Sequence, residues 1–510
     1  MEEKNKKSIG KNIFYNVLGQ GYTIILNIIC MPFYLKILGV EAYGVVGFFL
    51  ILQNWLNLLD MGLSATLCRQ VAFARGQKTG FSKFHNLLKS FEVVFILISL
   101  LIVSVVYTQS AWLSTEWLNS NSLDPSKISY CIGIMGLIIA IRFFSTLYRG
   151  GIIGFEDQVW LNKAIIAINT LKYIGVFAIF YFLSNSVEQF FEYQLFIAII
   201  EISLLGGRFY YNLPMSETKI GLHRIDWSEF VKVLPFSISV AYTSALQLII
   251  SQFDKLLLSG LLSLSEFGYF SIIVAISGGI MTAALPIFTA FQPRLTMLLT
   301  SKNFDHMLSL YSDMCQIVTW IVFSTTMLIV VFSREILYVF TGEERVYLWG
   351  GEILQWYALA SGLYAIGSCQ YYLQNAFGNL RSYVNGMTIS IILLAPLIYV
   401  ITNAFGALGA SRLLFGFSLL WCIFFTMYIH LKFAPDLHFT WFFKIILPIM
   451  SVILFLALAY SEMIKFNTEQ SRIIIASRLL LTGITFMLFS ALSVSPIRKK
   501  LFGKLRLEDR

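Results

Sequence analysis

Charged residues inside long apolar stretches are the positions where this sequence could do chemistry. Arg142, Lys172 and Glu201 each lie several residues inside such a stretch, Glu92 lies within another, and Arg149 stands near the end of the stretch that holds Arg142. An ionised side chain at the centre of a bilayer costs roughly 2.5–3.5 kcal/mol on insertion scales, so it usually pairs with an opposite charge or marks a pathway. Two interpretations stay open: internal ion pairs, such as Lys172 with Glu201, or cations that face a water-filled cavity.

Polar residues also recur at helical spacing on five apolar stretches, as in Gln53, Asn57, Asp60 and Ser64. This spacing places each set on one helix face, which must look at another helix or at water rather than at lipid. Hydrogen bonds between helices explain one such stripe. Stripes on five helices in both halves of the chain favour a shared hydrated cavity. The predicted cavity residues are Arg142, Arg149, Lys172, Asn57, Asn169, Gln247, Tyr364 and Asn375.

The chemistry of these residues suits an anionic, sugar-bearing ligand. Arg and Lys both bind phosphate, and Arg can do so with two parallel hydrogen bonds. Asn, Gln and Tyr suit sugar hydroxyls. A glycan linked to polyprenyl pyrophosphate offers both chemistries, together with a lipid tail that can stay in the bilayer. The residues permit this substrate without requiring it. Candidate proton or sodium sites for ion coupling are Asp254, Glu201 and Asp60.

Composition places these residues in a membrane protein. The chain has 510 residues, of which 57% are hydrophobic and 13% are charged, and its mean hydropathy is +0.74. Soluble proteins carry about 25% charged residues. The apolar runs predict an all-α polytopic membrane protein with about 14 transmembrane helices, because backbone groups cannot stay unpaired in lipid. The expected spans are 12–37, 42–68, 82–108, 127–150, 158–183, 189–211, 229–259, 266–292, 304–332, 350–378, 382–402, 407–432, 440–461 and 472–495.

Charge distribution predicts the topology. Most Lys and Arg residues fall in loops on one side of this arrangement, which the positive-inside rule makes cytoplasmic, and the even number of spans returns both termini to that side. This also explains the net charge of +9, so we expect no nucleic-acid partner. The six cysteines form no CxxC pair, and we expect no disulfide framework, metal site or cofactor.

An internal repeat divides the chain into related halves. Placing Gly44 of LGVEAYGVVGF on Gly268 of LSLSEFGYFSI aligns Tyr43 with Phe267. Two related halves are typical of transporters, with the substrate site between them. The predicted organisation is an N-terminal lobe at 1–212, a cytoplasmic linker at 213–228, a C-terminal lobe at 229–433, and two further helices with a basic tail at 434–510.

These motifs resemble a known family. The turn LGVEAYGVVGF, the basic end CRQVA, FDKLLLSGLLSLSEFGYFSI, QPRL, QNAFGNLRSYVN and FGALGASRL are similar to polysaccharide (O-antigen type) flippases of the multidrug/oligosaccharidyl-lipid/polysaccharide exporter superfamily. The resemblance runs from about residue 8 to about 435. It implies two six-helix lobes plus two C-terminal helices in the inner (cytoplasmic) membrane. It also implies alternating access and export of a lipid-linked oligosaccharide with H⁺ or Na⁺ coupling, and Asp254 matches an acidic position that recurs in the family. Membrane lipids and polysaccharide polymerase machinery are further expected partners.

Other functions remain as alternatives. A lipid II flippase shares the architecture and the cationic cavity. A drug antiporter of the superfamily usually has twelve helices and an acidic cavity. A membrane glycan polymerase or ligase needs a substantial outer loop with acidic, Arg or His groups. Here the outer loops are short and the five histidines lie near inner helix ends, so we expect a transporter and not an enzyme.

Overall fold

The chain folds as helices joined by short connections. In this computed structural model the described residues are 19, 21–23, 26, 29–60, 62–76, 80–118, 120, 122–182, 185–214, 227–300, 302–464 and 471–495. They form two compact units, Met1–Gly268 and Tyr269–Arg510. Most of the predicted linker, 215–226, lies outside the described residues, as do much of the first expected span and the basic tail from 496 on. The predicted lobe boundaries therefore stay a prediction.

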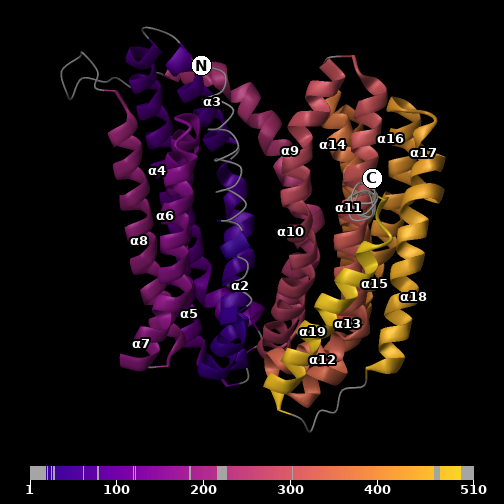
Figure 1. Cartoon of the computed structure of the whole chain (residues 1–510). Helices are drawn as coiled ribbons and strands as arrows, with labels where there is room; N and C mark the ends of the chain where they lie inside the picture. Colours follow the sequence, from indigo (N-terminus) through magenta and orange to yellow (C-terminus); the bar gives the residue numbers. More distant parts are fainter. Residues whose placement is uncertain are drawn as a thin grey trace, which may run out of the picture. The chain divides into compact units, whose positions relative to one another are not determined.

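The first unit contains long helices that run alongside one another (Figure 1). Its elements are α2 (Val40–Leu56), the 3₁₀ turn η1 (Asn57–Asp60), α3 (Leu63–Gly76), α4 (Gly80–Trp112), the π-helical turn η2 (Leu113–Trp117), α5 (Pro125–Gly154), α6 (Gln158–Thr170), the π-helical turn η3 (Leu171–Gly175), α7 (Val176–Phe182), α8 (Val187–Asn212) and α9 (Trp227–Leu261). Helix α10 (Leu264–Thr300) begins in the first unit and continues into the second.

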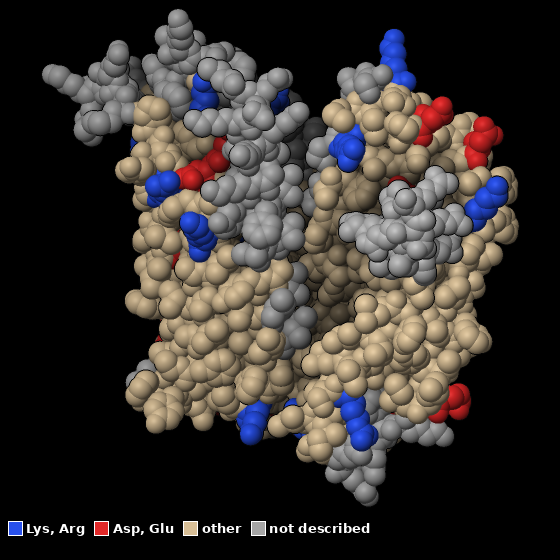
Figure 2. Space-filling view, in the orientation of Figure 1, with Lys and Arg blue, Asp and Glu red and all other residues tan. Residues whose placement is uncertain are grey.

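The second unit has the same construction. Its elements are α11 (Phe304–Val331), α12 (Ser333–Thr341), α13 (Glu344–Gly367), α14 (Cys369–Ala376), α15 (Arg381–Leu420), the π-helical turn η4 (Trp421–Phe425), α16 (Thr426–Phe433), α17 (Leu437–Phe439), the π-helical turn η5 (Thr440–Ile446), α18 (Leu447–Met463) and α19 (Arg472–Ala491). In each unit, a broad band without Lys, Arg, Asp or Glu crosses the visible face between charged ends (Figure 2).

Ten helical segments of the described chain are long and apolar enough to cross a membrane. One of them, Arg381–Phe433, has 53 residues. At 1.5 Å per residue it would be about 80 Å long, whereas a bilayer core is about 30 Å thick. It holds two expected spans, which meet at Gly406, where φ is 60° and the backbone leaves the helix. The all-α polytopic membrane fold is confirmed.

One expected span is divided. The sequence predicts a continuous helix over 42–68, but α2 ends at Leu56 and α3 begins at Leu63. Between them Gly62 takes φ +67°, a left-handed conformation that glycine adopts without steric cost. Asp60 then accepts hydrogen bonds from the Ser64 amide, at 3.2 Å, and from the Ser64 hydroxyl, at 2.7 Å. The polar stripe of this span is therefore split between two helical segments.

Both ends of α5 are defined by local chemistry. Asp124 caps its start, because the Ser126 amide donates to Oδ1 at 2.9 Å, and this hydrogen bond lowers the pKa of the Asp124 carboxyl. Near its other end, Gly150 lies against the backbone carbonyl of Ser64, and a Cβ on Gly154 would lie 2.6 Å from the Cys68 carbonyl. Small residues four apart let helix backbones approach closely in membranes. Helices α3 and α5 pack through this pair of glycines.

The two copies of the internal repeat touch each other within the first unit. A Cβ on Gly44 would collide with the Leu264 carbonyl, and one on Gly268 would collide with the Val40 carbonyl. Val40 and Leu264 occupy equivalent positions, four residues before each glycine. Each glycine therefore lies against the residue four positions before the glycine of the other copy. This reciprocal contact supports the alignment of the two segments.

We predict that Gly150→Leu destabilises the protein, because the added side chain meets backbone that cannot move aside. Overpacking of this kind typically costs about 1–3 kcal/mol. Thermal unfolding of purified protein should show a lower Tm than wild type. Gly133→Ala is the control, because its Cβ would meet the Tyr107 ring at an ordinary 3.6 Å. A Tm for Gly150→Leu equal to that of the control would contradict the packing role.

Candidate functional site

The candidate site lies where α5 packs against α8. Arg142 and Arg149 are seven residues apart on α5, so they share one helix face, and Gln194 and Glu201 share a face of α8 in the same way. Glycines bring the two helices together. Gly151 lies against the Phe209 ring, and a Cβ on Gly206 would lie 3.2 Å from the Tyr148 ring. The predicted residues Arg142, Arg149 and Glu201 are thereby brought into direct contact.

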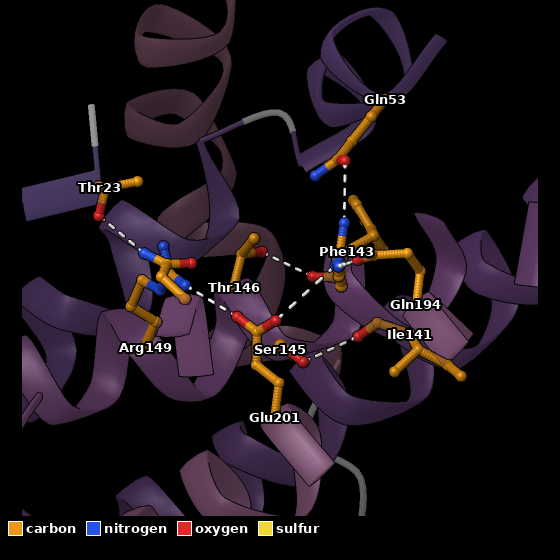
Figure 3. Close-up of polar contacts among 11 residues, drawn as sticks. Thr23, Gln53, Ile141, Phe143, Ser145, Thr146, Arg149, Gln194 and Glu201 are labelled. Carbon is orange, nitrogen blue, oxygen red and sulfur yellow. Dashed lines mark hydrogen bonds and ion pairs between the residues drawn. The ribbon is translucent and has the colours of Figure 1, made fainter. Parts of the chain in front are cut away.

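Glu201 joins the two arginines. One carboxylate oxygen accepts a hydrogen bond from Arg149 Nη2 at 3.0 Å, and the other lies 3.8 Å from Arg142 Nε (Figure 3). The Arg142 and Glu201 side chains are only 8% and 11% exposed. Breaking a buried ion pair by removing one partner is strongly destabilising, because it leaves an uncompensated charge. Glu201 therefore holds both arginines on this face.

Two glutamines complete the coordination of Arg142. Its Nη2 donates to Gln194 Oε1 at 3.2 Å, and its Nη1 donates to Gln53 Oε1 at 3.4 Å (Figure 3). Gln194 is 2% exposed and uses its other end as well, because Nε2 donates to the Lys172 carbonyl at 3.1 Å. Gln194 thus ties the Arg142 guanidinium to the segment that carries Lys172.

Lys172 sits in the π-helical turn η3. Such turns interrupt the helical hydrogen-bond pattern and are frequent at functional sites. The Leu171 carbonyl accepts a hydrogen bond from the Tyr193 hydroxyl at 2.8 Å, just as the Lys172 carbonyl accepts one from Gln194. The side chains of α8 therefore stabilise the turn. The Lys172 ammonium lies 5.2 Å from the Tyr173 ring centroid and has no hydrogen-bond acceptor among the described residues.

The cluster carries more positive than negative charge. Arg142, Arg149 and Lys172 act on one another electrostatically, and Glu201 is the carboxylate that acts on both Arg142 and Lys172. Glu201 forms its ion pairs with the two arginines and not with Lys172, so the Lys172–Glu201 pair considered from the sequence does not form. Two arginines share the one carboxylate of Glu201, which leaves a net positive charge that an anionic ligand would offset.

Arg149 is the accessible member of the cluster. Its side chain is 42% exposed, whereas that of Arg142 is 8% exposed. Its Nε is buried and has no hydrogen-bond partner among the residues that the structure describes. A guanidinium with an unused donor can bind phosphate in its planar, two-bond geometry. Arg149 therefore has the access that a ligand contact needs, although its unused Nε donor is itself buried.

The predicted polar residues beside this cluster have mixed roles. Asn169 donates to the Thr23 hydroxyl at 2.7 Å, which is a hydrogen bond between two helical segments. Asn57 is exposed at the start of η1. Asp60 caps α3 through Ser64, and the structure gives it no contact with the arginines. Gln247 is exposed on α9.

Asp254 is completely buried on α9. Its Oδ1 lies 3.2 Å from Lys255 Nζ, and its relative exposure is 0%. The last two predicted cavity residues, Tyr364 on α13 and Asn375 on α14, belong to the second unit and are partly buried. A common cavity that joins all of these residues stays a prediction.

Glu92 has a separate buried environment. It lies 3.1 Å from Lys89 Nζ and accepts hydrogen bonds from the hydroxyls of Tyr148, at 3.3 Å, and Tyr210. Its charge is thereby neutralised inside the first unit. Of the four intramembrane charges singled out in the first half, Glu92, Glu201 and Arg142 form ion pairs, as the ion-pair interpretation expects, whereas Lys172 forms none among the described residues.

Sequence reasoning missed two groups of buried residues. Gln194 escaped notice because a lone glutamine in an apolar stretch is unremarkable, although its seven-residue spacing from Glu201 was a usable signal. In the second unit, the Tyr311 hydroxyl lies 2.8 Å from His430 Nε2, and His430 Nδ1 lies 3.4 Å from His438 Nδ1. These two histidines are far apart from Tyr311 in sequence, and only the packing of α11 against α16 and α17 brings them together.

No group of three His, Cys, Asp or Glu residues within the described part of the chain is arranged to hold a metal ion. The six cysteines are free thiols. The site therefore consists of organic cations, one carboxylate and amides. Such groups can bind, orient and release an anion, and together with the membrane fold they define a polytopic membrane transporter.

Comparison with known proteins agrees with this class. Residues 9–299 match the profile of the family described as "Polysaccharide biosynthesis protein", and the chain belongs to this family. Two relatives are each named "Putative O-antigen transporter". The protein from Shigella flexneri is 21% identical over 299 residues, which cover 58% of this chain and 69% of the relative. The protein from Salmonella typhi is 25% identical over 260 residues, which cover 50% and 57%.

Solved structures share the fold. A lipid II flippase, MurJ, in an inward closed conformation has a TM-score of 0.65 and 15% identity, and the match covers 94% of this chain and 98% of that one. An inward-facing multidrug resistance MATE family transporter of the MOP superfamily has a TM-score of 0.68 and 14% identity, with 82% and 96% covered. The names of the two relatives agree with the expectation of a transporter and not an enzyme, and the solved structures, at 14% and 15% identity, show the fold.

We predict that Glu201→Gln lowers thermal stability, because Arg142 loses its buried counter-charge, a change that typically costs about 3–5 kcal/mol. The variant should also gain more Tm from added sodium pyrophosphate than wild type does, because its cluster is more positive. The comparison uses sodium chloride at equal ionic strength. Glu192→Gln, on an exposed position of the same helix, is the control. An unchanged Tm together with a wild-type response to pyrophosphate would refute the assigned role.

Proposed function

We propose that this protein moves a polyprenyl-pyrophosphate-linked oligosaccharide across the cytoplasmic membrane by alternating access, without covalent chemistry. The observation that carries the proposal is the excess of positive charge at the α5–α8 contact, where Arg142 and Arg149 share the single carboxylate of Glu201. A pyrophosphate brings at least two negative charges. It would therefore neutralise what Glu201 leaves uncompensated.

The three cations have different parts in this proposal. The Arg149 side chain is 42% exposed, so it makes the first contact with the pyrophosphate. Arg142 is held by Glu201, Gln53 and Gln194, so its charge is fixed in place before the ligand arrives. A charge that is already fixed needs no reorganisation when the ligand binds, so less free energy is lost on binding and the anion is held more tightly. Lys172 supplies a flexible point charge from the π-helical turn.

The remaining predicted residues suit the sugars. Asn57, Asn169, Gln247, Tyr364 and Asn375 carry amides or a phenol that can exchange hydrogen bonds with hydroxyls. The polyprenyl tail stays in the bilayer, so the protein has to shield only the head group. The names of the two O-antigen transporter relatives support a surface-polysaccharide repeat unit as the glycan.

The proposed setting follows from the same family. The protein lies in the inner membrane with both termini in the cytoplasm, and polysaccharide polymerase machinery receives the exported units. The division into lobes at 1–212 and 229–433, joined by the linker at 213–228 and followed by 434–510, remains part of this proposal.

Neutralising the site should stop export. Lys172→Ala and Arg142→Ala should each reduce surface glycan to background, because each removes a charge that the pyrophosphate needs; the amount of protein in the membrane is measured alongside, because Arg142→Ala also breaks a buried ion pair. The measurement is surface polysaccharide on cells that depend on this protein. Lys163→Ala, at an exposed lysine of α6, is the control. Near-normal surface glycan in both site variants would remove these residues from the site.

Ion coupling is assigned to Asp254, with Glu201 and Asp60 as further candidates. Asp254 is fully buried beside Lys255, so protonation or cation binding there would change a buried charge pair. We predict that Asp254→Asn weakens the response of transport to collapse of the proton or sodium gradient. The measurement is leaflet transfer in reconstituted vesicles. A full wild-type response in the variant would make Asp254 a structural residue.

A lipid II flippase is the second candidate, favoured by the likeness to the solved lipid II flippase over 94% of this chain. At 15% identity that likeness concerns the fold, whereas both named relatives are O-antigen transporters. Vesicles loaded with either lipid II or a lipid-linked O-antigen unit distinguish the two. Transfer of the second and not the first is the expected result, and the reverse would establish the lipid II function.

A further inference from the structure

The second unit contains a groove unrelated to the cation cluster of the first. It has a volume of about 900 Å³ and lies between the two helical segments of α15, which meet at Gly406, and the stretch that continues through η4 into α16. Inside the groove, Trp421 and Phe425 of the π-helical turn η4 stack with ring centroids 3.9 Å apart. The groove therefore has rigid aromatic and aliphatic walls.

The walls are apolar and open to the surroundings. Ile389, Leu393 and Phe424 line the groove with 58%, 62% and 62% of their surface exposed. Gly416 keeps space free, because a Cβ there would meet nothing within 4 Å. The segment of α15 that lines one wall, from Ser382 to Leu397, is about 22 Å long, which exceeds the roughly 15 Å of hydrocarbon in one leaflet. An acyl chain can lie along its full length.

The two ends of the groove differ in charge. At one end, Lys432 Nζ donates to the Ser382 hydroxyl at 2.7 Å and lies 6.0 Å from the Tyr428 ring centroid, with no carboxylate partner among the described residues. Arg381, also exposed, begins α15 beside Ser382. At the other end, Arg412 is already paired with Glu352 at 2.6 Å. The excess positive charge thus stands at the Ser382 end.

The predicted topology places that end on the cytoplasmic side. Basic pockets between transmembrane helices on this side bind the head groups of anionic lipids, and each Lys or Arg near the surface contributes about 1 kcal/mol. Tyr428 is exposed there, and tyrosines are enriched at the level of lipid head groups. An apolar groove of acyl-chain length that ends at two hydroxyls and Lys432, with Arg381 at the start of the adjoining helix, has the composition of a phospholipid site.

We propose that this groove binds one anionic phospholipid of the cytoplasmic leaflet. Its phosphate contacts Lys432 and Arg381, and Ser382 and Tyr428 supply hydroxyls beside it. One acyl chain occupies the space along Ile389, Leu393 and Gly416. This site does not depend on the proposed export function, because none of its residues belongs to the cation cluster.

The test uses the full chain in mixed micelles with phosphatidylglycerol or phosphatidylcholine that carries a photoreactive diazirine in the acyl chain. Crosslinks are mapped by peptide mass spectrometry. In wild type, phosphatidylglycerol should label peptides that cover 382–397 and 413–428 at least about fivefold more than phosphatidylcholine does, which corresponds to about 1 kcal/mol, the contribution of one cation. Lys432→Gln should lose most of this preference, and Gly416→Leu should lose groove labelling by both lipids.

Matched controls are Lys163→Gln, an exposed lysine of the first unit, and Gly207→Leu, an open helix position outside the groove. Both should label like wild type. If Gly416→Leu does not elute as a single species, Leu393→Trp replaces it. Equal labelling of wild type by the two lipids would overturn the proposal. Labelling of the Gly416→Leu groove at the wild-type level would also overturn it. Displacement by polyprenyl pyrophosphate at lower concentration than by unlabelled phosphatidylglycerol would also overturn it, because the occupant would then be the export substrate.

Discussion

The structure depends on keeping an excess of positive charge inside an apolar helix bundle. A lone cation there would be expelled toward water or would lose its proton. Here Glu201 neutralises part of the charge and joins Arg142 to Arg149, and two glutamines supply neutral acceptors. The net positive charge that remains is large enough to attract an anion and small enough for the folded helix bundle to tolerate. This balance connects the fold to a transport function.

The surrounding helices are built to maintain that balance. Glycines at the end of α5 let α3 and α8 approach its backbone, and the π-helical turn η3 carries Lys172. Gln194 links both features, because one amide bonds the Arg142 guanidinium and the Lys172 carbonyl. Loss of that amide would leave a buried donor and a buried acceptor without partners, at about 1–3 kcal/mol for each group.

Much of this could be predicted from the sequence, and the limits have physical reasons. Long apolar stretches predict membrane helices, and charged residues within them are conspicuous, so the fold class and the four charged residues Arg142, Arg149, Lys172 and Glu201 could be predicted. The ion pairs could not be predicted, because they depend on how each helix is rotated about its axis. Glu201 pairs with the two arginines and not with Lys172. The break at Gly62 and the π-helical turn η3 were also not predicted, because hydropathy does not distinguish a straight α-helix from a kinked or π-helical one.

The most direct measurement is equilibrium binding of polyprenyl pyrophosphate and of polyprenyl monophosphate to the purified protein. If the uncompensated cations receive the head group, the pyrophosphate should bind at least about tenfold more tightly, a difference of about 1.4 kcal/mol. Replacing Arg142, Arg149 and Lys172 together by glutamine should remove that difference. Equal affinities in the native protein, or a preference that survives the triple replacement, would contradict the account.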